Sequence, residues 1–288
     1  MKRHLWVVGL VGTVLAGCGQ APMGSVGPGA QGSTAGAATA ATAAGAVRAP
    51  SSLAGQRATL APTGALRVGV YRGSPTSLLV DSAGQRTGVS YELGQLLGQR
   101  LQVPVQVVEY SRVAEVIDGL KANQVDFTVT NASAARAQIV DFSKPLINLE
   151  LGYLVPAKSR VQAVADVDGS GIRVGVTEGS SSQGVLGRQF KNARVVPVPS
   201  LKVAADMLQS GQLDAFATNK AILNELADTV PGARILDGRW GLEHMAIAIP
   251  KGREGSLPQL DTFAQQLQMD GTLAAVIRRA GLRGTAAP

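Results

Sequence analysis

Two segments of the chain recur in the same order, and this internal duplication limits the possible folds more than any other feature. RVGVYRGS at 67–74 recurs as RVGVTEGS at 173–180, and LKANQVDFTVTN at 120–131 recurs as LQSGQLDAFATN at 208–219. Chance can produce one such match, but two matches in the same order indicate a pair of segments with like folds. The sequence therefore predicts two similar lobes.

Each half alternates short apolar strands with helices. In the first half, residues 66–70 and the alternating valines at 103–107 predict strands, and apolar residues at helical spacing over 89–97 predict a helix between them. In the second half, Ser200 and Asn219 are placed to cap two helices. Such alternation favours parallel sheets with right-handed crossovers. We expect an α/β protein in which each lobe is a mostly parallel sheet flanked by helices.

The repeated polar residues follow the predicted strands. In open parallel sheets, ligands bind beyond the carboxyl ends of the strands, near helix N-termini. Glycines there allow tight turns, and hydroxyls and amides offer uncharged hydrogen bonds to a polar ligand. For any single residue, helix capping or turn closure is an equally good explanation. The set predicts a ligand cleft, and its members are Gly73, Ser74, Thr130, Asn131, Gly179, Ser180, Thr218 and Asn219.

Composition excludes several classes of function. Charged residues make up 16% and apolar residues 45% of the 288 residues, which is typical of a packed core. The net charge is +7, but the basic residues are scattered and only 4% of residues are aromatic, which does not indicate nucleic-acid binding. Cys18 is the single cysteine, and His4 and His244 are the only histidines. We therefore expect no disulfide, no metal site and no cofactor.

The N-terminal segment is typical of an exported lipoprotein. Residues 1–17 have a basic start and a short apolar stretch, which predicts a signal peptide. The Leu-Ala-Gly that precedes Cys18 resembles the bacterial lipobox, so Cys18 is the expected lipidation site, with an ordinary leader as the alternative. Residues 19–63 are rich in Ala, Gly, Ser and Thr, and with Cys18 they predict a lipidated flexible tether over 18–63.

Beyond the tether, the residues resemble family 3 of the extracellular solute-binding proteins, which serve amino-acid-type ABC importers. Short motifs over 65–282 carry the resemblance by their order and spacing: Leu66–Val70, Gly84, Gly88, Tyr91–Leu93, Asp126, Ser133–Arg136, Asp141–Pro145, Gly175–Ser181, Asp214–Ala215 and Asp270–Leu273. The resemblance implies a two-lobed, type 2 periplasmic-binding-protein clamshell. It places lobe one at 64–148 and 241–288 and lobe two at 149–240, with crossings near 147–151 and 238–243.

The resemblance also implies which residues bind the ligand. The arginine at the place of Arg136 grips a carboxylate in relatives, which suits the planar fork of a guanidinium. Ser180 and Ser181 match a helix N-terminal turn that binds the same carboxylate. The alternative for Arg136 is a surface ion pair with Asp141. We expect four more residues to line the cleft: Ser74, Tyr71, Asn131 and Asn219.

One departure from the family pattern concerns the charge in the cleft. Relatives usually place an aspartate, which pairs with the ligand's ammonium group, where this chain has Asn219. An amide cannot supply that charge. The sequence therefore leads to two hypotheses: the ligand is a carboxylate compound other than an ordinary α-amino acid, or Glu178 replaces the aspartate.

The predicted function is that of a monomeric substrate-binding lipoprotein, with an ABC permease complex as its partner and its only membrane contact through the lipid anchor. An enzyme of the cyclohexadienyl dehydratase type is one alternative, with Glu178 or Glu92 as the candidate acid. A ligand-sensing lipoprotein without transport is another. Trp240 and His244 flank the second predicted crossing, where they either touch the ligand or belong to the core.

Overall fold

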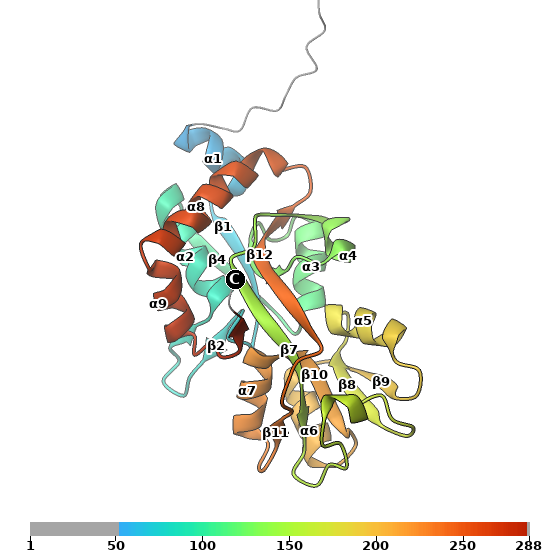
Figure 1. Cartoon of the computed structure of the whole chain (residues 1–288). Helices are drawn as coiled ribbons and strands as arrows, with labels where there is room; N and C mark the ends of the chain where they lie inside the picture. The colour runs from blue at the N-terminus through green and yellow to red at the C-terminus, as the bar shows by residue number, and fades with distance from the viewer. Residues whose placement is uncertain (1–51, 287–288) are drawn as a thin grey trace, which may run out of the picture. The chain divides into compact units, whose positions relative to one another are not determined.

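A computed structural model describes residues 52–286 (Figure 1). Its helices are α1 (Leu53–Leu60), α2 (Val89–Leu101), α3 (Val113–Lys121), α4 (Ala134–Ala137), α5 (Ser181–Gln189), α6 (Leu201–Gln209), α7 (Lys220–Thr229), α8 (Leu257–Met269) and α9 (Thr272–Arg279), with 3₁₀ turns η1 (Val164–Asp166) and η2 (Glu254–Ser256). Its strands are β1 (Leu66–Tyr71), β2 (Leu79–Val80), β3 (Arg86–Thr87), β4 (Val105–Tyr110), β5 (Thr128–Asn131), β6 (Val140–Phe142), β7 (Ile147–Val155), β8 (Arg173–Thr177), β9 (Arg194–Val198), β10 (Ala215–Asn219), β11 (Arg234–Ile235), β12 (Gly241–Pro250) and β13 (Thr285–Ala286). Each strand and helix that the sequence predicts is present.

Two groups of parallel strands flank a central antiparallel pair. On one side, β4 pairs with β1, and a parallel bridge from Val68 to Phe127 connects β1 to the start of β5. On the other side, β8 lies between β9 and β10 and is parallel to both. The central pair consists of β7 and β12, which are antiparallel from Gly241 opposite Leu151 to Met245 opposite Ile147. Strand β12 also pairs with β5, and β7 pairs with β10.

The hydrophobic cores divide along the same line. One core is built from residues between 60 and 149 and between 245 and 282, with Ala221 of α7 added, and it includes side chains of α2, α8 and α9. A smaller cluster within the same two ranges comprises Ile117, Leu120, Val125, Val140 and Ala248. Two further cores use residues between 153 and 236. We call the two parts lobe one and lobe two. Leu149 belongs to the core of lobe one and Tyr153 to a core of lobe two, so the chain passes between the lobes within β7. The exact boundaries at 64–148, 149–240 and 241–288 stay predictions.

The duplicated motifs make the same contact in both lobes. The backbone N–H and Nε of Arg67 donate to Asp126 Oδ2 at 3.0 and 2.8 Å. The backbone N–H and Nε of Arg173 donate to Asp214 Oδ2 at 2.8 and 2.9 Å. In each lobe the pair ties the start of the first strand to the turn before a later strand. The repeated arginine and aspartate therefore share a structural role.

Helix α1 corrects the predicted tether, which is wrong from Ser52 onward. Ser52 caps the helix by accepting a hydrogen bond from the N–H of Gly55 at 3.1 Å. Leu60 and Ala61 are buried in the core of lobe one, and Arg57 Nε donates to the Leu101 carbonyl at 2.6 Å. The composition is misleading because this stretch has few large apolar side chains. Those at its end, however, pack into the core of lobe one. Cys18 and the rest of 1–51 lie outside the described residues.

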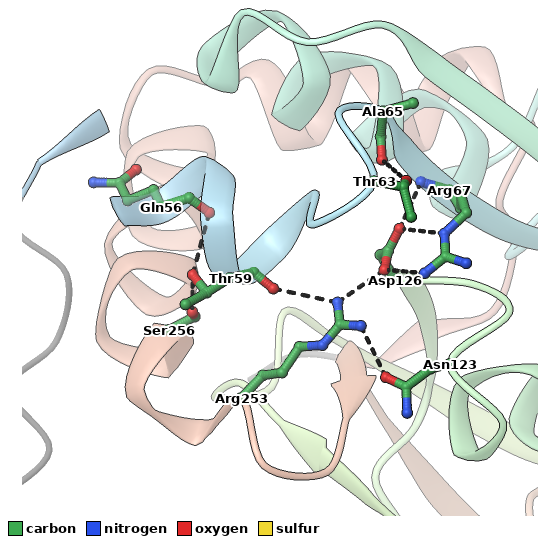
Figure 2. A network of polar contacts seen from close by, with 9 residues as sticks. All are labelled: Gln56, Thr59, Thr63, Ala65, Arg67, Asn123, Asp126, Arg253 and Ser256. Carbon is green, nitrogen blue, oxygen red and sulfur yellow. Dashed lines mark hydrogen bonds and ion pairs between the residues drawn. The ribbon is translucent and has the colours of Figure 1, made fainter. Parts of the chain in front are cut away.

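A polar network holds α1 and Asp126 together (Figure 2). Arg253 NH1 donates to the Thr59 carbonyl at 3.2 Å and to Asp126 Oδ1 at 2.8 Å. Arg253 NH2 donates to Asn123 Oδ1 at 2.8 Å, and the Ser256 hydroxyl donates to Thr59 Oγ1 at 2.8 Å. The loop before α8 thus joins the N-terminal helix to the Arg67–Asp126 pair. Within 52–286, no helix has the length and apolar character needed to cross a membrane.

The docking of α1 predicts a stability effect. Leu60 is 2% exposed, so Leu60→Ala should lower the free energy of unfolding by about 2–3 kcal/mol through lost burial and a cavity. Leu53→Ala is the matched control, because Leu53 lies on the same helix and is 36% exposed. Chemical denaturation of both variants measures the difference. Equal, small losses would show that α1 does not contribute to the core.

Candidate functional site

A cavity lies where strands of both lobes end. Lobe one contributes Tyr71, Thr76, Val113, Thr130, Asn131 and Arg136 to its lining. Lobe two contributes Thr177, Ser180, Ser181, Leu201, Thr218 and Asn219, and β12 contributes Glu243 and Met245. The empty volume is about 440 Å³ with the space at the mouth included. The structure thus brings together six of the eight predicted binding residues: Tyr71, Asn131, Arg136, Ser180, Ser181 and Asn219.

Arg136 is a buried cation with an unused donor. Ser133 caps the short helix α4 and so fixes the position of Arg136, whose side chain is buried between strand ends. Arg136 NH1 donates to Thr130 Oγ1 at 2.6 Å, while NH2 is buried without a partner among the described residues. Burial lowers the pKa of this guanidinium, and the Glu243 carboxylate acts in the opposite direction. A buried, unpaired N–H of a cation is costly and favours an anionic ligand.

Asp141 does not pair with Arg136. Its carboxylate accepts a hydrogen bond from Lys251 Nζ at 2.6 Å instead. The alternative of a surface ion pair between Arg136 and Asp141 is therefore wrong. Arg136 remains available to a ligand.

Ser180 and Ser181 form the N-terminus of α5 at the cavity wall. Ser180 caps the helix by accepting from the N–H of Gln183 at 3.2 Å. Ser181 Oγ accepts from Asn131 Nδ2 at 3.2 Å and donates to Glu243 Oε1 at 2.9 Å. The first N–H groups of a helix have no intrahelical partners, and the helix dipole favours negative charge there. This end of the cavity suits an anion.

Asn219 and Glu243 form one unit. Asn219 Oδ1 caps α7 by accepting from the N–H of Ile222 at 3.1 Å, and Nδ2 donates to Glu243 Oε2 at 2.9 Å. Glu243 comes from β12 and is 6% exposed. An aspartate at position 219 would face a second carboxylate at hydrogen-bonding distance, so an amide is the fitting partner. The acid is present in the cavity, but on β12, which β7 separates from the strand where the resemblance places it.

Sequence reasoning missed Glu243. The signal for it is an acid at the predicted second crossing, between Trp240 and His244, just before the apolar run at 245–249. Trp240 is half-buried and packs against a core of lobe two: Nε1 donates to the Gly152 carbonyl at 3.0 Å and the ring lies 6.0 Å from that of Tyr153. His244 is exposed and shares a hydrogen bond with Asn148 Oδ1 at 2.8 Å. Neither residue lines the cavity.

Glu178 and Ser74 are not among the cavity residues. The Glu178 side chain is 52% exposed and forms an ion pair with Arg112 at 3.5 Å, so it does not replace the missing aspartate. Successive side chains of a strand alternate in direction, and Thr177, just before Glu178, is the one that faces the cavity. Ser74 is fully buried behind the cavity, where it accepts a hydrogen bond from the Tyr71 hydroxyl at 3.3 Å.

Tyr71 is the aromatic residue of the cavity wall. Burial raises the pKa of its hydroxyl, while the hydrogen bonds with Ser74 and Thr76 act in the opposite direction. Ser74 thus orients the Tyr71 hydroxyl.

Among residues 52–286, no group of three or more His, Cys, Asp or Glu side chains is arranged to hold a metal ion.

The cavity and most of the fold fall within the span of one family model. The model for bacterial extracellular solute-binding proteins, family 3, matches residues 66–281. The chain belongs to this family. The matched span begins with β1 and ends just after α9, so it contains every cavity residue named above and leaves out α1.

Individual relatives agree with this assignment. The ABC transporter glutamine-binding protein GlnH of Bacillus subtilis (strain 168) is 22% identical over 202 residues, which cover 69% of this chain and 74% of that protein. The solute receptor for L-cysteine of Neisseria gonorrhoeae has a TM-score of 0.71 at 23% identity, covering 79% of this chain and 94% of its own. An ancestral amino-acid-binding protein, a precursor of cyclohexadienyl dehydratase, has a TM-score of 0.67 at 23% identity, covering 76% and 96%. The predicted two-lobed fold class is confirmed.

Proposed function

We propose that this chain is the substrate-binding lipoprotein of an ABC importer and that it captures a small α-amino acid between its lobes. The observation that carries the proposal is the pairing of opposite charges in one cavity: Arg136, with a buried unpartnered NH2, and the buried Glu243. An amino acid in water carries one carboxylate and one ammonium group. The cavity offers one partner for each.

The carboxylate is expected at Arg136 and the N-terminus of α5. Arg136 NH2 donates one charge-assisted hydrogen bond, and the first N–H groups of α5 and the hydroxyl of its cap Ser180 supply further donors from the other lobe. Because a single ligand group then has partners in both lobes, it stabilises the arrangement in which they face each other. Binding and lobe closure are thereby coupled.

The ammonium group is expected at Glu243. Asn219 and Ser181 hold both oxygens of Glu243 in place, one hydrogen bond to each. Each carboxylate oxygen accepts more than one hydrogen bond, so Glu243 still has acceptor capacity for a ligand. The hypothesis that the ligand has no amine group assumed that the cavity has no acidic side chain. Glu243 lines the cavity, so this assumption does not hold.

We propose a binding role without catalysis. The two acids considered as catalytic candidates are engaged elsewhere, Glu178 with Arg112 and Glu92 with Arg279. Glu243, the acid in the cavity, accepts hydrogen bonds at both oxygens, as an anchor for a cation does. The GlnH and L-cysteine receptor names agree with solute binding.

Export, lipid anchoring at Cys18 and a permease partner belong to the same proposal. The signal-like segment at 1–17 and the family of extracellular proteins support them. The monomeric state and the absence of nucleic-acid partners stay predictions from composition.

Thermal unfolding against matched ligands tests the proposal. Each amino acid is paired with its des-amino acid, and a ligand at 100 times its Kd should add about 2.7 kcal/mol of stability, a shift of a few degrees. We expect shifts with amino acids and none with the des-amino acids at the same concentrations. Equal shifts within each pair would leave Glu243 without a ligand role.

Replacing Glu243 with glutamine should selectively weaken the binding of the amine. Glutamine keeps the size and one acceptor oxygen but removes the charge, so affinity for the amino acid should fall roughly ten- to hundredfold. Titration calorimetry measures it, with Glu254→Gln in η2, outside the cavity, as the control. A variant that folds normally and binds the amino acid as tightly as the wild type would exclude Glu243 as the ammonium site.

A further inference from the structure

The charges that line the cavity cancel, which restricts the ligand beyond its head group. Among the described residues that line it, Arg136 is the cation and Glu243 is the anion. The charged residues that adjoin the lining in sequence all have ion-pair partners. Arg112 pairs with Glu178, and Arg72, Lys202 and Lys220 pair with Glu109, Asp206 and Glu150. Once a ligand's carboxylate and ammonium groups occupy Arg136 and Glu243, no ionised side chain of the lining remains for a third charge.

The rest of the lining is neutral. Three threonine hydroxyls, from Thr76, Thr177 and Thr218, lie alongside the aliphatic side chains of Leu201 and Ile222, and all five residues are at most 9% exposed. Hydroxyls can pair with neutral polar atoms, and aliphatic groups exclude water. Burying an unpaired charge against such a wall carries a large desolvation cost.

The space beyond the head group is also restricted. Asn131 of lobe one donates to Ser181 of lobe two, and a Cβ added to Gly179 would lie 2.4 Å from the Cβ of Ala114 in α3. Gly179 has a positive φ of 71°, so glycine satisfies both the backbone conformation and the close approach of the lobes. With the lobes this close, a long side chain would have to leave through the mouth.

We propose, as an inference that rests on the proposed function, that the ligand is an α-amino acid with a short, uncharged side chain and zero net charge. Basic amino acids and acidic amino acids are both disfavoured, because either kind brings a third charge. The selection works through the absence of a counter-charge in the wall, not through a specific contact to the side chain.

The first arm of the test is calorimetry of the wild-type protein with alanine, serine, threonine, cysteine and glutamine, compared with lysine, arginine, aspartate and glutamate. We expect at least one neutral amino acid to bind at least a hundredfold more tightly than every charged one. Charged amino acids that bind as tightly as the neutral ones would overturn this inference and leave the proposed function standing. If none of the amino acids binds, the proposed function fails as well.

The second arm places a charge in the wall. Val113 lines the cavity, is half-buried, and is the first residue of α3, where a carboxylate is favourable to the helix dipole. Val113→Asp should raise the affinity for lysine or arginine at least tenfold relative to the best neutral ligand. Leu53→Asp is the matched control, since Leu53 is also the first residue of a helix but is exposed and outside the cavity. An unchanged ranking in Val113→Asp would overturn the inference that wall charge sets selectivity.

Discussion

Arg136→Ala is expected to abolish measurable ligand binding while the protein stays folded. The side chain is 8% exposed, its NH2 has no partner among the described residues, and under the proposed function the ligand carboxylate is its acceptor. Truncating one partner of a buried, charged hydrogen-bonded pair costs about 2–5 kcal/mol, or roughly thirty- to several-thousandfold in Kd. Calorimetry with the best ligand of the neutral panel measures the loss.

Two variants sharpen this test. Arg136→Lys keeps the charge but loses the planar fork, so its affinity should fall between those of the wild type and Arg136→Ala. Arg188→Ala removes an exposed arginine of α5 and should bind like the wild type. A folded Arg136→Ala protein with wild-type affinity would refute the carboxylate site, whatever the lysine variant does.

Asp126→Asn is expected to cause the largest loss of stability. The Asp126 side chain is fully buried and accepts hydrogen bonds from Arg67 at both oxygens and from Arg253 at Oδ1 (Figure 2). An asparagine leaves two arginines beside a neutral group, and breaking a buried ion pair costs about 3–5 kcal/mol. Asp214→Asn is the matched comparison from the other lobe. Asp214 pairs with Arg173 alone and is more exposed, so its loss should be smaller.

The effect of Asp126 should depend on pH. Burial alone would raise the pKa of this carboxyl, but hydrogen bonds from Arg67 and Arg253 outweigh it and hold the pKa below its usual value. A lowered folded pKa stabilises the protein above the unfolded pKa of about 3.9, and that stability is lost as pH falls through the folded value. Denaturation at pH 7 and at steps below pH 4 should show the wild type's advantage over Asp126→Asn shrinking. A constant difference across this range would contradict the ion-pair account.

Local sequence patterns predicted those site residues that lie at strand ends or cap helices. Asn219 ends β10 and caps α7, and Ser180 caps α5, so their places depend on neighbours within a few residues. Arg136 came from the family resemblance, and the cap by Ser133 three residues earlier supports its place. Asn219 and Ser180 share the cavity because β8 and β10 are parallel, so their carboxyl ends meet at one edge of the sheet.

Glu243 could not be predicted in the same way. Its partners, Ser181 and Asn219, lie 62 and 24 residues away in the sequence. Which way its side chain points depends on the register of β12 against β7, where Glu243 lies opposite Leu149. A shift of one residue would turn the carboxylate to the other face. Sequence alone does not set that register. Sequence also did not show that Thr177, and not Glu178 beside it, faces the cavity.

Helix α1 has a mechanical consequence for lobe closure. A load applied at Ser52 enters α1 and passes through Leu60, Arg57 and Thr59 into α2 and the loop before α8, all within lobe one. The path does not run through β7 and β12, which connect the lobes. Traction at the N-terminal end would therefore be borne within lobe one and not across the two strands that connect the lobes.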